Sequence, residues 1–247
     1  MALSRMNKKD PTGALKWERK YEKAILKIVD QFNDDVVDAF THMWDTGELR
    51  TLEAGKFDPT KFYPFVDKLA DKKLNKPAKK TIKKVIPKAY AQGVSFGSVV
   101  LGAPYEERAE SWARIATLLA QNENEFKGYS TESAKRINRI IGDGVIKEKT
   151  QGQIIDDLNK EFDMSKSRAT RIIRTETMRA VNTGVDDRYE REGIRDTGHG
   201  RKPPIHPNCR CTIIVERRDG KMVKVWLAHF EPGRTCGECE DLDGTVI

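Results

Sequence analysis

Residues 15–46 read LKWERKYEKAILKIVDQFNDDVVDAFTHMWDT, and apolar side chains recur along this stretch at steps of three or four. That spacing places them on one face of an α-helix. Gly47 follows the last apolar position and is expected to end the helix. The stretch predicts a long helix that packs against more than one neighbour through Trp17, Tyr21, Ile25, Ile28, Val29, Phe32, Val36, Val37, Phe40, Met43 and Trp44.

Further stretches downstream carry the same helical spacing. Gly142 and Gly144 punctuate this pattern, and Ser165 or Ser167 is expected to cap the last helix. Gly193 is expected to end that helix. The expected helices are residues 105–126, 131–141, 153–162 and about 165–192.

The longest weakly polar run extends from Ala89 to Pro104 and contains Gly93 and Gly97. Small residues four positions apart allow two helices to approach closely, and the run is shorter than the roughly 18 apolar residues that span a bilayer. Residues 1–13 lack the apolar segment of a secretion signal. We therefore expect close helix packing, no membrane contact, and a protein kept in the cytosol or in a particle assembled there.

The pattern changes after Gly193. Loop residues are followed by two β-rich runs, residues 211–215 and 222–227, joined by a turn that contains Asp219 and Gly220. The sequence therefore predicts an α+β fold, with a mainly α-helical N-terminal part and a small C-terminal β-hairpin module clustered around cysteines.

The chain is basic, with a formal net charge of +7 and 34% charged residues. The densest positive charge lies between Lys68 and Lys88, where nine lysines stand against the single acid Asp71. Pro77 and Pro87 bracket a short predicted helical segment within this run. Two interpretations stay open: a solvated face, or a patch that contacts DNA phosphates without sequence preference. Aromatic residues that could stack on bases are absent from the run. The candidate DNA-binding residues are Lys72, Lys73, Lys76, Lys79, Lys80, Lys83 and Lys84.

All four cysteines fall in the last 39 residues, which points to a local role. In a reducing compartment such a cluster favours a metal over a disulfide. The predicted hairpin would bring its two ends together, much as zinc ribbons do. Structural zinc, cysteines without metal and catalytic zinc all stay open. The five candidates for four tetrahedral positions are His206, Cys209, Cys211, Cys236 and Cys239.

Glu176 falls on the apolar stripe formed by Ala169, Ile172, Ile173 and Ala180. An unpaired buried carboxylate costs several kcal/mol, so Glu176 should meet an arginine or several hydrogen-bond donors. Nearby arginines stand at positions 174 and 179. We predict a structural role in helix packing, and no catalytic residue is assigned.

Three segments together resemble the Mu protein F-like family of phage minor head proteins. They are RATRIIRTETMRAVNTGVDDRYEREGI (168–194), PPIHPNCRC (203–211) and VWLAHFEPGRTCGECEDLDGTVI (225–247). The matching region covers roughly residues 151–247. The positions that carry the resemblance are Arg174, Thr175, Glu176, Asn182, His206, Cys209, Cys211, Cys236, Cys239, Asp243 and Gly244.

The resemblance implies a virion protein of few copies in the phage head, near the portal vertex, that helps head assembly and genome packaging or ejection. The implied partners are the portal protein, capsid or scaffold proteins and double-stranded DNA, and no reaction is implied. It divides the chain into a helical portal- and DNA-associated region (1–128) and a head-morphogenesis domain (129–247), which ends in a Cys/His module (193–247). In the family the CxxC segment precedes HPNCRC, whereas here it follows. We still expect the two segments to meet in space.

Two other classes of function remain as alternatives. One is a head-borne enzyme, either a zinc-dependent nuclease that uses His206 or His199, or an ADP-ribosyltransferase-like protein that uses residues 174–176. The other is a zinc-ribbon DNA-binding regulator, for which no recognition helix is evident.

Overall fold

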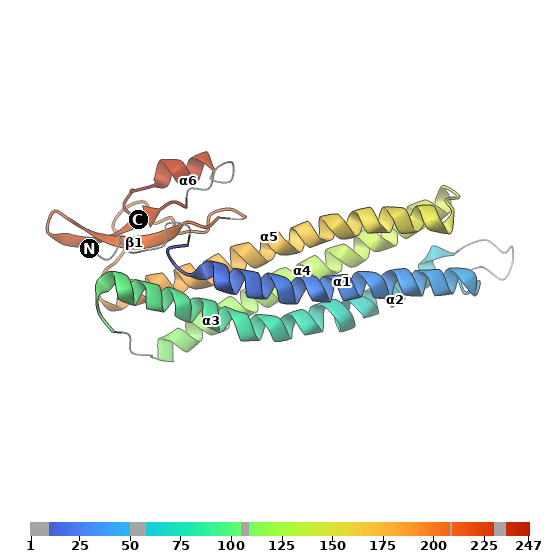
Figure 1. The fold of residues 1–247 in the computed structure, drawn as a ribbon, viewed down its shortest axis with the longest axis horizontal. Coiled ribbons are helices and arrows are strands. Elements are labelled where there is room, and N and C mark those ends of the chain that lie inside the picture. Colours follow the sequence, from blue (N-terminus) through green and yellow to red (C-terminus); the bar gives the residue numbers. More distant parts are fainter. Residues whose placement is uncertain (1–9, 50–57, 105–108, 208, 230–235) are drawn as a thin grey trace. The chain divides into compact units, whose positions relative to one another are not determined.

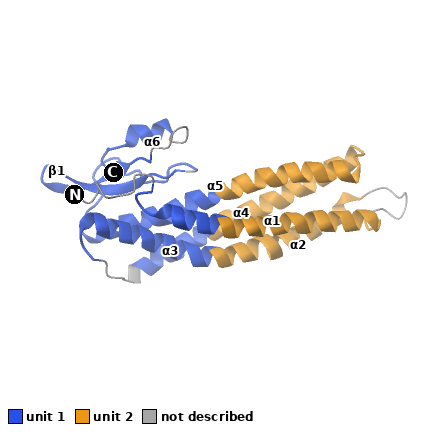
Figure 2. Ribbon diagram, in the orientation of Figure 1, with its two compact units in different colours: residues 1–22, 82–122, 171–247 blue, residues 23–81, 123–170 orange. Residues whose placement is uncertain are grey.

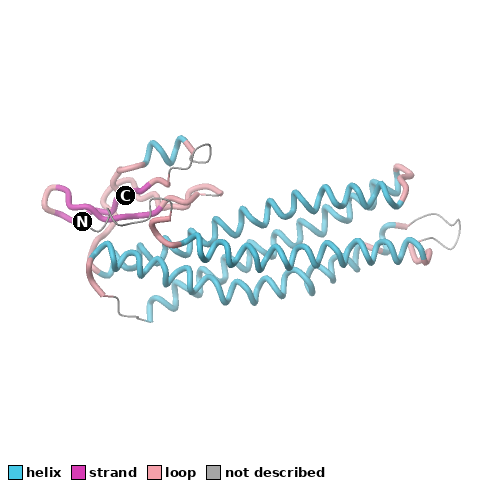
Figure 3. The backbone as a smooth tube through the Cα atoms, viewed as in Figure 1, coloured by secondary structure: helices cyan, strands magenta, loops and turns pink. Residues whose placement is uncertain are grey.

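The computed structural model describes residues 10–49, 58–104, 109–207, 209–229 and 236–247. Within them the fold is mainly helical, with one two-stranded antiparallel sheet near the C-terminus (Figures 1 and 3), which confirms the predicted α+β class. No described helix is long and apolar enough to cross a membrane. The elements are α1 (Ala14–Asp45), the 3-10 helix η2 (Pro59–Lys61), α2 (Tyr63–Leu69), the π-helical η3 (Ala70–Asn75), α3 (Lys76–Leu101), α4 (Ala109–Ile146), α5 (Gln151–Arg191), β1 (Thr212–Arg218), β2 (Lys221–Leu227) and α6 (Gly237–Leu242).

The chain forms two compact units, each built from segments that are distant in sequence (Figure 2). Unit 1 comprises residues 1–22, 82–122 and 171–247, and unit 2 comprises residues 23–81 and 123–170. The boundary expected at residue 128 separates a portal- and DNA-associated region from a head-morphogenesis domain. It is a functional boundary, and it stays a prediction.

Unit 2 is a helical packing of apolar faces. The rings of Phe40 and Phe62 meet edge to face at 5.8 Å, and both side chains are fully buried. Tyr129 is also buried, and its hydroxyl lies 2.6 Å from the hydroxyl of Ser165. The apolar face predicted for residues 15–46 is confirmed in its main members, since Tyr21, Ile25, Val29, Phe32, Val36 and Phe40 are all buried.

Unit 1 brings α3 and α5 into backbone contact. A Cβ atom placed on Gly93 would lie 1.9 Å from the carbonyl oxygen of Val181, and one placed on Gly184 would lie 2.1 Å from the carbonyl oxygen of Tyr90. Only glycine therefore fits at positions 93 and 184. The close packing predicted from Gly93 and Gly97 is confirmed.

Three expectations about helix boundaries are wrong. Pro87 lies inside α3 rather than at the end of a short segment, because apolar residues on both sides of it are buried and hold the helix together. The glycines at 142 and 144 lie within the continuous helix α4. Ser165 and Ser167 lie within α5, since their hydroxyls bond to Tyr129 and to the carbonyl of Asp163 instead of capping a helix.

The predicted hairpin and the helix end before it are confirmed. Gly193 follows α5 with a φ of +75°, and Asp219 and Gly220 form a tight turn with positive φ at both positions. The sequence did not indicate that the last residues extend this sheet. Val246 bridges Val225 antiparallel, and the amide of Trp226 donates to the carbonyl of Thr245 (2.9 Å). A third extended segment thus covers the free edge of β2.

Candidate metal centre

The five sulfur and nitrogen side chains predicted to bind metal converge in the Cys/His module of unit 1. His206 and Cys209 lie in the loop before β1, and Cys211 directly precedes that strand. Cys236 is the N-cap of α6, and Cys239 lies in its first turn. The hairpin therefore returns the chain so that the two cysteine segments meet, as predicted.

Cys239 is the centre of the group. Its sulfur lies 3.0 Å from Nε2 of His206 and 3.8 Å from the sulfur of Cys209. Cys236 completes one group of three with His206 and Cys239, and Cys211 completes a second with Cys209 and Cys239. Within each group the potential ligand atoms lie within 4.8 Å of one another, so the cluster can hold a metal ion.

The sulfur spacing matches metal coordination better than a disulfide. A disulfide would bring two sulfurs to about 2.05 Å, whereas those of Cys209 and Cys239 are 3.8 Å apart. In a tetrahedral site with bonds of about 2.3 Å, two sulfurs stand about 3.8 Å apart. The observed pair is already at the edge length of such a site.

Burial disfavours charge on these thiols when no cation is present. Cys209, Cys211 and Cys239 are buried. The hydrogen bond of the Cys209 thiol to Cys211 and then burial raise the pKa of Cys209, while burial and then the charge of Cys209 raise the pKa of Cys239 to about 12. A bound dication would reverse this preference, because it favours the thiolate form of each ligand.

His206 is oriented for coordination. Its Nδ1 lies 2.9 Å from the carbonyl oxygen of Pro207, which can only accept a hydrogen bond. The proton on Nδ1 leaves the lone pair of Nε2 directed toward Cys236 and Cys239. Metal-ligating histidines are held by a carbonyl in the same manner.

Two contacts tie the cysteine loop to the long helices of unit 1. Asn182 of α5 donates a 2.8 Å hydrogen bond to the carbonyl of Cys211. Glu18 of α1 accepts from both Arg174 (3.0 Å) and Arg210 (2.7 Å), and its side chain is almost fully buried. Arg174 and Asn182 therefore both lie at this junction, and their structural role stays a prediction.

The sequence carried a signal for Glu18 that was overlooked. It lies three positions before Tyr21 and seven before Ile25, so it occupies the buried stripe of α1. A carboxylate on that stripe requires a partner, by the reasoning that was applied to Glu176.

Glu176 is buried and paired, as predicted. It is 2% exposed and forms an ion pair with Arg179. Its second oxygen accepts from the amide of Asn122 (3.0 Å), whose own oxygen accepts from the hydroxyl of Tyr21 (2.9 Å). Burial raises the pKa of Tyr21, which keeps this hydroxyl protonated as the donor.

Thr175, Asp243 and Gly244 are the remaining positions that carry the resemblance, and each of them shapes or bonds to the backbone. The hydroxyl of Thr175 donates to the carbonyl of Arg171 within α5. A carboxylate oxygen of Asp243 accepts from the amide of Ala228 (2.8 Å), and Gly244 has a φ of +72° that returns the chain toward β2. His199, named in the nuclease alternative, lies 3.1 Å from the hydroxyl of Thr245 and is exposed.

A second ionic cluster of unit 1 was not predicted. Lys224 of β2 is fully buried and pairs with Asp186 of α5 and with Asp196 (2.8 Å). Lys202 contacts the same two carboxylates, and both hydrogen bonds raise its pKa against the effect of burial. The pairs join β2 and the loop after α5 to that helix.

The seven candidate DNA-binding lysines are exposed, apart from the half-buried Lys73. Three of them are ion-paired: Lys73 with Asp35, Lys76 with Asp71, and Lys79 with Glu123. Among the residues described, no carboxylate pairs with Lys72, Lys80, Lys83 or Lys84. DNA binding by this run stays a prediction.

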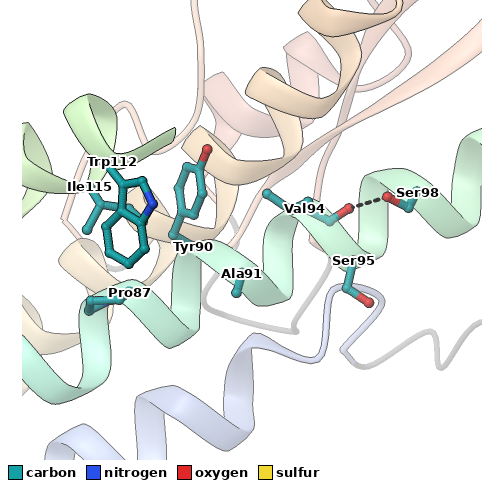
Figure 4. Close-up of a pocket in the computed structure, with 8 residues that line it drawn as sticks. All are labelled: Pro87, Tyr90, Ala91, Val94, Ser95, Ser98, Trp112 and Ile115. Carbon is teal, nitrogen blue, oxygen red and sulfur yellow. Dashed lines mark hydrogen bonds between the residues drawn. The ribbon is translucent and has the colours of Figure 1, made fainter. Parts of the chain in front are cut away.

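Unit 1 also contains a mostly apolar pocket of about 370 Å³ between α3 and α4 (Figure 4). Trp112 is 59% exposed at its rim. The pocket shares no residue with the candidate metal ligands. Its lining residues are Pro87, Tyr90, Ala91, Val94, Ser95, Ser98, Trp112 and Ile115.

No protein-family model, no curated protein and no solved structure matches the chain.

Proposed function

We propose that this chain is a structural protein of the head of a tailed phage, and that zinc holds its Cys/His module together. The observation that carries the proposal is the Glu18 junction. Arg174 from the first resembling segment and Arg210 from the second bind the same buried carboxylate. Arg174, which the resemblance singled out, and Arg210, which lies between two of the singled-out cysteines, thus join the segments to one another and to α1.

This use of the motif residues favours assembly over catalysis. Arg174 and Glu176, which a transferase would direct at a substrate, are engaged in ion pairs with Glu18 and Arg179. A head protein near the portal needs a rigid module to present to its partners, and a closed metal site provides rigidity in a small element. Portal, capsid or scaffold proteins and duplex DNA are the proposed partners.

Zinc is the metal that the donor set favours. Thiolate and imidazole ligands in tetrahedral array select zinc or iron–sulfur centres, and the 3.8 Å sulfur spacing suits a single zinc ion. Cys239 belongs to both groups of three and is the ligand that either arrangement needs. His206 and Cys211 then compete for the last position.

Elemental analysis tests the metal. Protein purified without chelator should contain about one zinc per chain. Cys239→Ser should lose the metal, while His199→Ala, at an exposed histidine outside the cluster, should retain it and is the matched control for His206→Ala. His206→Ala and Cys211→Ser, compared side by side, identify the fourth ligand. Metal-free wild-type protein would remove zinc from the proposal.

The virion role has its own test. In the phage that encodes the chain, an antibody should detect it in purified particles, and particles made without the gene should show defective heads or DNA content. Intact, fully infectious particles that lack the protein would refute the role, whatever the metal analysis shows.

A further inference from the structure

Trp17 stands at the centre of a cluster of lysines drawn from two helices of unit 1. Lys16 and Lys20 of α1 place their ammonium groups 5.4 and 5.5 Å from the centroid of the indole, and Lys88 of α3 lies at 5.8 Å. Lys84 lies one turn before Lys88 on α3 and is also exposed. We call Lys16, Trp17, Lys20, Lys84 and Lys88 the Trp17 cluster.

The sequence alone gives no link between these residues. Its periodicity places Trp17 on the buried face of a helix, and the lysine run contains no aromatic residue that could stack on bases. In the structure Trp17 is only half-buried, and Gln92 of α3 donates to the carbonyl of Thr12, two residues before α1 (2.9 Å). The fold therefore supplies the aromatic ring that the run lacks.

The cluster is unneutralised among the described residues. No carboxylate pairs with Lys16, Lys20, Lys84 or Lys88, and α3 contains no Asp or Glu at all. Two acids close in sequence are engaged elsewhere: Asp10, before α1, accepts from the amide of Leu15, and Glu18, between Lys16 and Lys20, is buried against two arginines.

Such crowding of like charge is unfavourable without an anion. The three ammonium groups around the indole are at most about 11 Å apart, given their distances to its centre. That is close to one Debye length at 0.1 M salt, so their repulsion is only partly screened. Two like-charge pairs one helical turn apart, Lys16 with Lys20 and Lys84 with Lys88, add to it. Attraction to the ring face holds the lysines in place, and a bound anion would relieve the strain on them.

We infer that the Trp17 cluster binds the phosphate backbone of a nucleic acid. A DNA strand carries one charge for each 3.4 Å of axis, so about three phosphates pass over a patch of about 11 Å. An acidic peptide fits less well, because an extended chain points alternate side chains away and presents only half of its carboxylates. The inference rests on the DNA association proposed above. The Trp17 cluster shares Lys84 with the candidate lysines of residues 72–84 and adds Lys16, Trp17, Lys20 and Lys88.

Salt titration of duplex binding tests the inference. We would measure the binding of a labelled 30-base-pair duplex of mixed sequence by fluorescence anisotropy at several salt concentrations. The triple variant Lys16/Lys20/Lys88→Gln should bind about 100-fold more weakly at 0.1 M salt, and its salt slope should fall by about 2.7. Trp17→Leu should weaken binding about 2- to 5-fold with the slope unchanged, because the charges remain.

A charge-matched variant controls for net charge. Lys127/Lys135/Lys147→Gln removes three exposed lysines from other positions and should bind nearly as the wild type does. Circular dichroism should give the same melting curve for both triple variants. If the Trp17-cluster variant binds as well as this control, the inference is overturned.

Three further outcomes distinguish a failure of the Trp17 cluster from a failure of the proposed DNA association. Loss of binding in Lys72/Lys79/Lys80→Gln alone would leave the proposed DNA association intact and reject the Trp17 cluster. Absence of duplex binding by the wild type would reject both. Competition by poly-glutamate that equals competition by duplex, at the same charge concentration, would show that the cluster takes an acidic protein segment instead.

Discussion

The side-chain amide of Asn182 donates a 2.8 Å hydrogen bond to the carbonyl oxygen of Cys211. Asn182 is 2% exposed, and its own oxygen has no described partner. The bond is thus the single described link of this side chain, and it fixes the backbone of a candidate metal ligand against α5. A mutation that breaks this hydrogen bond is therefore expected to affect both α5 and the loop that carries the candidate metal ligands.

Asn182→Asp should break this link, because a carboxylate oxygen cannot donate to a carbonyl. The free energy of unfolding should fall by about 1–3 kcal/mol, and zinc should be released at lower chelator concentration. Asn159→Asp, at an exposed position of the same helix, is the control and should change stability by less than about 0.5 kcal/mol. Urea titration measures the free energy of unfolding of both variants. An equal loss of stability in the two would contradict the assigned link.

Glu18→Ala should be among the most damaging single changes. It removes the buried carboxylate that the partly exposed Arg174 and Arg210 share, which should cost about 3–5 kcal/mol of unfolding free energy. Glu132→Ala removes the half of an exposed pair with Arg136 and should cost less than about 1 kcal/mol. The inference about the junction fails if urea unfolding ranks the two variants alike.

Two glycine-to-alanine changes in helices should have opposite signs. Gly93→Ala forces a methyl group to within 1.9 Å of the carbonyl of Val181 and should destabilise by at least about 1–3 kcal/mol. Gly128→Ala meets nothing within 4 Å and should stabilise by about 0.5–1 kcal/mol, since alanine favours the helix. Thermal unfolding of both variants gives the comparison. Stabilisation by the first would mean that α3 and α5 are not in backbone contact.

Removal of metal should act locally. Chelation is expected to increase hydrogen exchange in the Cys/His module after Gly193, because coordination energy is folding energy for so small an element. Amides in the middle of α5 should keep their protection, since buried apolar contacts hold that helix. Exchange that rises equally in both regions would show that the metal supports the whole of unit 1.

Periodicity was enough to predict the helix around Phe32 and the hairpin around Gly220, because each depends on local spacing. The meeting of Cys209 with Cys239 followed from the same hairpin. The helix breaks expected at Pro87 and Ser165 were wrong because packing across the unit overrides local preference. Contacts between distant helices, such as Trp17 with Lys88, leave no periodic trace in either segment.

The order in which the chain is synthesised determines when the Glu18 junction can form. Arg210 is 192 residues downstream of its carboxylate, so at about 5–20 residues per second roughly 10–40 s pass before that partner leaves the ribosome. Until Arg174 has emerged, α1 carries a carboxylate that can be buried only at a penalty, and until Arg210 has emerged one of its two partners is missing. A prematurely terminated product would keep this defect permanently. The complete junction therefore forms only after the cysteine segment has been synthesised.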